Sequence, residues 1–340
     1  MNQQLREGDG HRKRPKEHTE LVPIRSRELT RAGLECLPAA IGRAGQAAAW
    51  RFVEFFTATI RNKNTRAAYA EAVSQFFAWC ERHRVTTLDQ INPVVIATYI
   101  EHHPGAAPTV KQHLAAIRML FDFLVIGQIV PMNPASSVRG PKHVVRRGKT
   151  PVLTAAQART LLDSIKTDSI VGLRDRAIIG LMCFTFARVS AMVHMQTGDY
   201  YENGKRWWVR LHEKGGKRHE VPCHHNAEAY LDAYRDAAGI RDEKNSPLFR
   251  SVDNRRKLTE NPMTRTDVLR MVKRRALQAG LPSSTCCHTF RATGITAYLE
   301  NGGTLENAAM IAAHESPRTT KLYDRTGDEI TLDEVERIVI

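Results

Sequence analysis

Four residues near the carboxyl end of the chain have side chains that could together handle a phosphate. His288 and Arg291 are spaced H-x-x-R, His314 follows 23 residues after Arg291, and Tyr323 follows nine residues after His314. Residues three apart lie on one helical face, so His288 and Arg291 can point at one group. Guanidinium donors fit a phosphate, imidazole exchanges protons near neutral pH, and nearby cations favour a phenolate. The stretch therefore contains a nucleophile and the charge stabilisers that phosphoryl transfer needs.

Two further cations stand in notable positions upstream. Arg188 interrupts an otherwise apolar run at 177–195, and a buried guanidinium needs a carboxylate or a bound phosphate as its partner. Lys214 lies in EKGGK, whose two glycines predict a hairpin turn between strands at 207–211 and 219–222. From the residues alone, an internal salt bridge remains open for Arg188 and a solvated side chain remains open for Lys214.

The stretch from His288 to Tyr323 resembles the carboxy-terminal catalytic box of the tyrosine recombinases, the phage-integrase family that includes the Xer-type recombinases. In that family H-x-x-R, then Gly-His, then Tyr occur at this spacing. The segment LMCFTFARVSAMVHM resembles the box with the family's first catalytic arginine, and EKGGKRHEVP resembles its lysine-bearing hairpin. The chain departs at two positions, because Ala313 stands where the family usually has Gly and Ala191 where it often has an acid. If that acid supports the arginine, another group must replace it, or the site is looser.

The resemblance implies a set of catalytic residues, with Lys217 as a weaker candidate for the lysine. These are Arg188, Lys214, His288, Arg291, His314 and Tyr323. The two arginines would brace the phosphate, and the lysine would protonate the leaving oxygen. Of the two histidines, the first would accept the tyrosine proton and the second would hydrogen-bond the phosphate.

The activity implied is that of a site-specific DNA recombinase or integrase working through a 3′-phosphotyrosyl intermediate. Cationic side chains would supply the charge that Mg²⁺ supplies elsewhere, and one ester replaces another, so neither metal, ATP nor any other cofactor is expected. Two alternatives stay open. One is a type IB topoisomerase-like or hairpin-resolving enzyme with the same chemistry, and the other is a non-catalytic DNA-binding relative.

Composition agrees with a polyanionic partner. The 340 residues carry 50 Lys and Arg against 36 Asp and Glu, a formal net charge of +14, which suits double-stranded DNA. Six cysteines occur without a C-x-x-C pair, so we expect reduced thiols and no metal site. No apolar run approaches the ~18 residues of a membrane span, and the opening residues are polar, so we expect a cytoplasmic, nucleoid-associated protein without membrane contact.

The expected fold class is mainly α with a small β-sheet. A four-helix, SAM-like core-binding domain precedes an α+β catalytic domain of the tyrosine-recombinase type. Helices are predicted at 47–60, from a cap at Asn64 or Thr65, at 92–101 and from Thr109. In the second half, T-A-A-Q at Thr154 predicts a capping box, and further helices are predicted at 173–186, at 224–238 and from Thr264. The expected divisions are a flexible basic tail at 1–39, the core-binding domain at 40–135, a basic linker at 136–150, the catalytic domain at 151–327 and a tail helix at 328–340.

Basic residues on polar helix faces and in the linker are candidates for DNA phosphate contacts, with a merely solvated face as the alternative. The candidates are Lys63, Arg66, Lys111, Arg118, Arg146, Arg147, Lys149 and Arg274. Recombination joins two duplexes and so needs four protomers. We expect a monomer in solution and a homo-tetramer on paired DNA sites, assembled through the apolar residues of the tail at 328–340.

Overall fold

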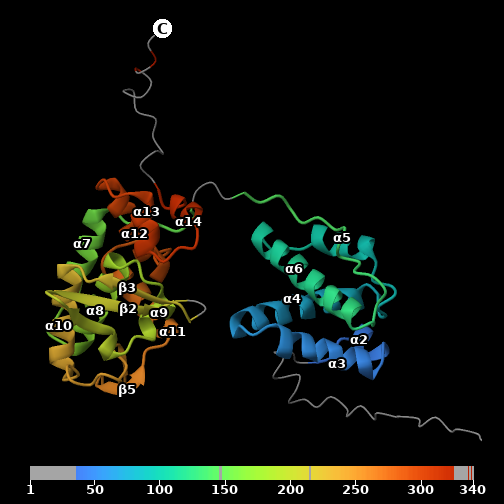
Figure 1. Ribbon diagram of the computed structural model, residues 1–340, viewed down its shortest axis with the longest axis horizontal. Coiled ribbons are helices and arrows are strands. Elements are labelled where there is room, and N and C mark those ends of the chain that lie inside the picture. The colour runs from blue at the N-terminus through green and yellow to red at the C-terminus, as the bar shows by residue number, and fades with distance from the viewer. Residues whose placement is uncertain (1–35, 145–147, 214–215, 325–335, 337, 339–340) are drawn as a thin grey trace, which may run out of the picture. The chain divides into compact units, whose positions relative to one another are not determined.

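The computed structural model describes residues 36–144, 148–213, 216–324, 336 and 338, and it divides into two compact units (Figure 1). The first unit is Met1–Val144 and the second is Val145–Ile340. Each unit has its own hydrophobic core, and each is described by itself. The expected basic tail at 1–39 lies almost entirely outside the described residues, as does the expected tail helix at 328–340, apart from Glu336 and Ile338.

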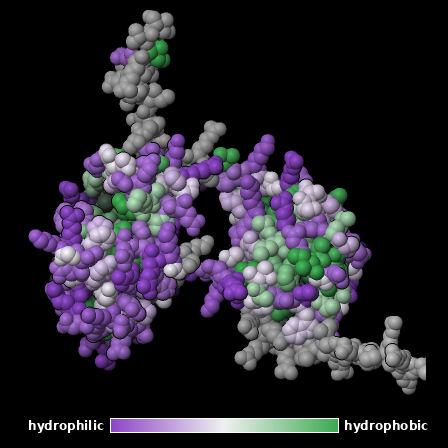
Figure 2. All heavy atoms as spheres, in the orientation of Figure 1, coloured by the Kyte–Doolittle hydropathy of each residue, from purple (hydrophilic) through white to green (hydrophobic). Residues whose placement is uncertain are grey.

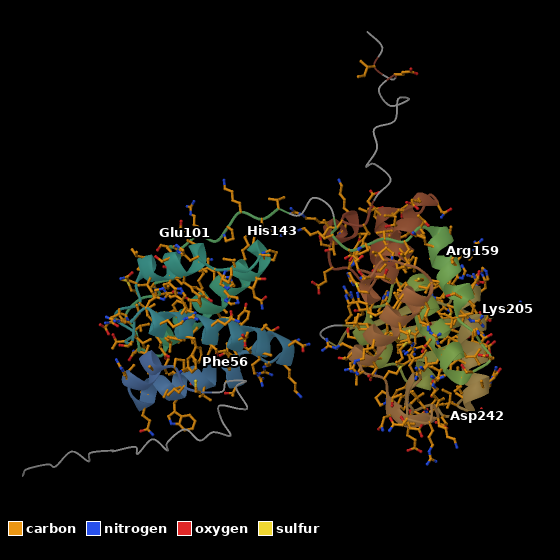
Figure 3. The ribbon with its side chains drawn as sticks, turned by 180° about the vertical axis from the view of Figure 1, so that it is seen from behind. Phe56, Glu101, His143, Arg159, Lys205 and Asp242 are labelled. Carbon is orange, nitrogen blue, oxygen red and sulfur yellow. The ribbon has the colours of Figure 1, made fainter. Side chains whose placement is uncertain are left out.

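The described part of the first unit is helical throughout. Its elements are α2 (Ala39–Arg43), α3 (Gln46–Glu54), a π-helix (Phe55–Thr59), α4 (Lys63–Arg82), α5 (Pro93–Glu101) and α6 (Ala107–Ile126). The two long helices, α4 and α6, pack against each other, and aromatic side chains fill the space around them. Phe56, labelled in Figure 3, is fully buried there and meets Phe52 edge to face. The unit is thus a small bundle with one apolar centre.

The helices described in this unit differ from the prediction at four places. The helix expected at 47–60 turns into a π-helix at Phe55, and α2 adds a fifth α-helix to the four predicted. The cap of α4 is Asn62, whose side chain accepts from the two backbone N–H groups that follow Lys63. The helix predicted from Thr109 starts earlier, because Pro108 is well accepted in a first turn.

The second unit is helical with two small sheets. Its helices are α7 (Ala155–Ser164), α8 (Ile170–Phe184), α9 (Val189–Val193), a 3₁₀ turn (Thr197–Asp199), α10 (His225–Ala238), α11 (Arg265–Gln278), α12 (Cys287–Glu300), α13 (Leu305–Ile311) and α14 (Pro317–Lys321). The strands β1 (Tyr200–Asn203), β2 (Arg206–His212) and β3 (Arg218–Pro222) form an antiparallel sheet in chain order, and β4 (Arg250–Val252) pairs with β5 (Leu258–Pro262). The hairpin of β2 and β3 was predicted, whereas the other three strands were not.

Helix α8 is the centre of the second unit. It packs against α10 and α12, and its buried residues include Ala177, Ile178 and Leu181. The predicted capping box is confirmed. The Thr154 side chain accepts from the N–H of Gln157, and the Gln157 side chain accepts from the N–H of Thr154. In Figure 1, α12, α13 and α14 lie together at one end of this unit. Since α12 packs on α8, and α13 packs on α12 and α14, the three carboxy-terminal helices are held against the centre of the unit.

The visible surface of the second unit is mainly hydrophilic, whereas that of the first includes a hydrophobic patch (Figure 2). Among the described residues, no helix combines the length and the apolar character needed to span a membrane.

Candidate active site

Helix α12 presents the H-x-x-R pair. The helix begins after Cys286, whose N–H donates to the Thr289 hydroxyl at 3.0 Å, and it carries His288 in its first turn and Arg291 in the next. Two of its threonines hold neighbouring segments, because the Thr293 hydroxyl accepts from the N–H of Leu153 and the Thr296 hydroxyl donates to the carbonyl of Tyr323. A helix fixed on several sides gives the two functional side chains a defined direction.

Arg291 is buried, with 1% of its surface exposed, and backbone carbonyls orient it. Its Nη1 donates to the carbonyl of Phe186, and its Nη2 donates to the carbonyl of Ala312 at 2.6 Å. Phe186 has φ +54°, a left-handed conformation that is costly for an aromatic residue. Burial, followed by the nearby Arg188, lowers the pKa of Arg291 to about 10, so the guanidinium stays charged at neutral pH.

Tyr323 follows α14, and its side chain lies beside those of His288 and His314. Its hydroxyl lies 2.7 Å from Nε2 of His288, and only 8% of the residue is exposed. Its backbone is held from two sides, since its carbonyl accepts from the hydroxyl of Thr296 at 2.9 Å and its N–H donates to the carbonyl of Thr320 at 2.9 Å. The tyrosine is therefore placed by α12 and α14 together, beside a base that could accept its proton.

His314 is placed by the end of α13. The N–H of Ala313 donates to the carbonyl of Met310 and that of His314 to the carbonyl of Ala309, both at 3.0 Å, which is a Schellman motif. Ala313 takes the left-handed conformation of that motif, with φ +47°. This explains why glycine suits the position. The imidazole stacks on the Tyr323 ring, with centroids 5.8 Å apart.

Both histidines are neutral near pH 7. Burial, then Arg291 and Arg188, lowers the pKa of His288 below its ordinary value. The same causes, with His288 added, lower the pKa of His314 to about 3. Nδ1 of His314 lies 2.8 Å from the Thr320 hydroxyl, which leaves Nε2 for a ligand. A neutral His288 beside a tyrosine hydroxyl can act as a proton acceptor.

Arg188 reaches this site from the start of α9. It is the N-cap residue of that short helix, and its Nη1 forms an ion pair with Oε2 of Glu213. Arg291 donates to the carbonyl of Phe186, two residues before Arg188, so the two arginines meet at one point of the chain. The charge of Arg188 lowers the pKa of Arg291 and of both histidines. The structure thus brings together five of the six catalytic candidates, and the internal partner that the sequence left open for Arg188 is Glu213.

The lysine candidates lie on the turn between β2 and β3. Lys214 falls outside the described residues, and Lys217 is exposed. The turn closes through the N–H of Glu213, which donates to the carbonyl of Lys217 at 2.8 Å. At the start of β3, next to this turn, Nε2 of His219 lies 2.9 Å from the carbonyl of Ile311 and ties the strand to α13.

The predicted DNA contacts divide into two groups. Three arginines have partners within the chain. Arg66 donates to the carbonyl of Ile60, Arg118 to those of Ala135 and Val138, and Arg274 to the Asp175 carboxylate at 3.0 Å. These contacts give the three arginines a structural role, and their contact with DNA stays a prediction.

The lysines among these candidates are exposed, namely Lys63, Lys111 and Lys149. Arg146 and Arg147 lie outside the described residues. Within the described parts of the chain, no group of three or more His, Cys, Asp or Glu side chains could hold a metal ion, and the six cysteines are free.

Sequence reasoning missed three residues that shape the site: Glu213, Thr296 and Thr320. The threonines sit at ordinary helical positions, and their role follows only from contacts across 27 and 6 residues of chain. Glu213 directly precedes Lys214 in the predicted turn, and that adjacency was the one available signal.

Comparison with known proteins identifies the class. Residues 151–329 match the model of the phage integrase family, and residues 51–127 match that of the phage integrase N-terminal SAM-like domain. Because the first match alone spans more than half of the chain, the protein belongs to the phage integrase family and is a tyrosine recombinase.

Among its relatives are recombinases of the Xer type. The tyrosine recombinase XerD of Oceanobacillus iheyensis is 25% identical over 268 residues, which cover 76% of this chain and 86% of the relative. XerD of Chlorobaculum tepidum is 28% identical over 270 residues, covering 76% and 85%.

Solved structures show the same fold. The XerH site-specific recombinase bound to palindromic difH substrate, in a post-cleavage complex, has a TM-score of 0.67 at 16% identity, covering 92% of this chain and 88% of that one. A lambda integrase dimer bound to a COC′ core site has a TM-score of 0.62 at 18% identity, covering 84% and 79%.

Proposed function

We propose that this tyrosine recombinase cuts and rejoins double-stranded DNA at specific sites through a 3′-phosphotyrosyl link to Tyr323. The observation that carries the proposal is the 2.7 Å contact between the Tyr323 hydroxyl and Nε2 of His288. A neutral imidazole at this distance can accept the proton as the oxygen attacks. Arg188 and Arg291 add two positive charges beside Tyr323 and His288. Guanidinium groups in such a position can bind the phosphate of a phosphodiester.

The proposed step is a displacement at phosphorus. The Tyr323 oxygen forms a bond to the phosphorus, its proton passes to His288, and the bond to the 5′ oxygen of the next nucleotide breaks. Lys214 donates a proton to that departing oxygen. Arg188 and Arg291 hold the non-bridging oxygens as charge builds on them, and the loss of either should cost about 10²–10³ in rate. Rejoining is the reverse reaction with the 5′ hydroxyl of another strand.

Neither a metal ion nor ATP has a part in the proposed reaction. Guanidinium groups and imidazoles supply the positive charge, and a phosphodiester is exchanged for a phosphotyrosine ester of similar energy. Cleavage should therefore proceed at an unchanged rate when a chelator replaces divalent cations in the buffer. A requirement for a divalent cation in the cleavage step would contradict this.

The test is trapping of the covalent intermediate. A pool of duplexes with a randomised core and a single nick loses the short 5′-hydroxyl strand after cleavage, so rejoining is prevented. The full chain should form adducts that survive denaturation, and sequencing the recovered DNA gives the target and the attached base. The Tyr323→Phe variant should bind the selected duplex with unchanged affinity and form no adduct. An adduct that persists in this variant would refute the assignment.

Assembly on DNA is part of the proposal. The fold is also similar to that of a lambda integrase tetramer bound to a Holliday junction, at a TM-score of 0.61 and 18% identity. We infer a DNA-bound tetramer of this chain, joined through the tail and acting in the cytoplasm at the nucleoid. Deleting 328–340 should preserve DNA binding and abolish strand exchange, and unchanged exchange would contradict the inference.

A strand-exchange assay separates recombination from topoisomerase-like chemistry. Two selected duplexes with different flanking labels should exchange arms when both are present with the full chain. Cleavage and resealing without exchange of the labels would instead support the type IB topoisomerase-like alternative. DNA binding without any covalent adduct would support the non-catalytic one.

A further inference from the structure

The ion pair between Arg188 and Glu213 links two distant parts of the second unit. Arg188 stands at the start of α9, and Glu213 is the first residue after β2. The carboxylate side chain is 4% exposed, whereas the guanidinium is 34% exposed. A carboxylate so deeply buried needs a cationic partner. The arginine side chain, by contrast, is partly open to solvent.

The contact uses only part of the guanidinium. Oε2 of Glu213 binds Nη1, and an arginine offers five N–H donors in one plane. The donors that remain can therefore bind a phosphate while the carboxylate fixes the plane. A side chain held in this way loses little rotational freedom when its ligand arrives.

Glu213 is itself fixed by backbone contacts. Its N–H donates to the carbonyl of Lys217 at 2.8 Å, and its carbonyl accepts from the N–H of Gly216 at 3.3 Å. These bonds close the turn next to Lys214. The same residue thus ties Arg188 to the hairpin that carries the proposed proton donor.

Position 191, where the resemblance to the tyrosine recombinases leads us to expect an acid, offers no such support. Ala191 lies three residues after Arg188, in the first turn of α9, and it is fully buried. Its methyl group cannot accept a hydrogen bond. Glu213 approaches the same guanidinium from the sheet instead of from α9.

Glu213 also moderates the repulsion between the two arginines. After burial, the charge of Arg188 is the next cause that lowers the pKa of Arg291, while Glu213 acts in the opposite direction. One carboxylate at this place therefore reduces the cost of holding two guanidiniums together before DNA binds.

We propose that Glu213 is the positioning residue for Arg188, in place of an acid at 191, and that it aligns the guanidinium for the phosphate in the cleavage step. The proposal rests on the proposed function of the site and adds a residue to it. A guanidinium displaced by about 1 Å can cost on the order of 10²-fold in rate. The loss should fall on the chemical step and not on DNA affinity, because the carboxylate itself would repel a phosphate.

The first experiment is a double-mutant cycle on single-turnover adduct formation, with the nicked duplex recovered from the selection. Glu213→Gln should slow cleavage about 10²-fold at saturating DNA, with less than about a threefold change in Kd. In the Arg188→Ala background the same change should have almost no effect, because Glu213 acts through Arg188. An equal loss in both backgrounds, an unchanged rate, or a faster rate in Glu213→Gln would overturn the proposal.

A matched control is available on the same hairpin. Glu220 on β3 binds Nε of Arg210 at 2.7 Å, and its side chain is exposed. Glu220→Gln should leave the cleavage rate within about twofold, since exposed pairs contribute little. If Glu220→Gln slowed cleavage as much as Glu213→Gln does, any broken ion pair on this hairpin would impair cleavage. That result would refute a specific role for Glu213.

A second measurement does not depend on cleavage. In the full chain labelled with ¹⁵N-arginine, the Arg188 guanidinium should give a separate, slowly exchanging resonance, assigned by its loss in Arg188→Ala. That resonance should average with the exposed arginines in Glu213→Gln and persist in Glu220→Gln. Absence of any adduct with the unsubstituted chain would refute the proposed function alone. An Arg188 resonance unchanged in Glu213→Gln would refute the positioning role whatever the activity.

Discussion

The low pKa of His314 makes the stability of the second unit depend on pH. Burial, followed by Arg291, Arg188 and His288, lowers this pKa to about 3 in the folded protein. The ordinary value is about 6.5. Between these two values the unfolded chain binds one proton more than the folded chain, so stability is complete above about pH 6.5 and falls as the pH decreases toward 3.

The expected magnitude follows from this difference in proton binding. One extra proton corresponds to about 1.4 kcal/mol per pH unit, and from pH 7 to pH 5 the loss sums to about 2 kcal/mol. Because His314 is only partly buried, solvent screening reduces the expected loss to about 1–2 kcal/mol. His288 contributes with the same sign, since its pKa is also lowered.

The assay compares the full chain with its His314→Gln variant by urea unfolding at pH 7 and at pH 5. The unsubstituted chain should lose about 1–2 kcal/mol more than the variant between the two pH values. All the other histidines are present in both proteins, so their contributions cancel in the difference. An equal loss in the two proteins would refute the reasoning, because His314 would then titrate alike in the folded and unfolded states.

Three glycine and alanine substitutions test how the scaffold holds the site. Gly294→Ala should destabilise the protein by about 1–3 kcal/mol, because a Cβ there would overlap the carbonyl of Cys183, although alanine is normally favoured within a helix. Ala313→Gly should stabilise it by about 0.5–1 kcal/mol, since φ is +47° there, and should leave cleavage unchanged. Gly148→Ala should slow cleavage about tenfold, because its Cβ would lie 2.7 Å from the carbonyl of Leu322, next to the nucleophile. Thermal unfolding checks the first two and single-turnover adduct formation the third.

Each of the three has a contradicting outcome. A higher melting temperature for Gly294→Ala would mean that α12 and α8 are not in close contact at this point. A lower one for Ala313→Gly would mean that the end of α13 is not left-handed in solution. For Gly148→Ala, Gly42→Ala is a control for cleavage, since its added Cβ would lie 3.7 Å from the Leu37 side chain, an ordinary contact, and equal rates in the two variants would contradict the contact with Leu322.

Local spacing in the sequence predicted the parts of the site that depend on one element. His288 and Arg291 share α12, as H-x-x-R indicates, and the capping box at Thr154 and the cap at Thr264 follow from side chains three residues away. In these cases the interacting groups are neighbours along the chain, so their types and spacing carry the information.

The remaining parts depend on contacts between distant segments. No local pattern relates Arg188 to Glu213, which lie 25 residues apart on a helix start and a strand end. The π-helix at Phe55–Thr59 replaces an expected α-helical turn in a segment whose apolar spacing fits either form, and tertiary packing decides between them. Ala313 looked like a departure from the family pattern, yet the backbone takes the conformation that glycine would adopt.

The charges of the site also indicate how a bound phosphodiester would change it. Burial, then the charges of Arg291 and Arg188, lowers the pKa of His288, while Tyr323 and Glu213 partly oppose the effect of Arg188 on the pKa of Arg291. A phosphodiester bound between the two arginines adds a negative charge, and an anion raises the pKa of a nearby imidazole. His288 thus becomes a stronger proton acceptor when the phosphate is in place, while the two guanidiniums become less costly to hold together. The same pair of arginines would therefore bind the substrate and couple its presence to deprotonation of Tyr323.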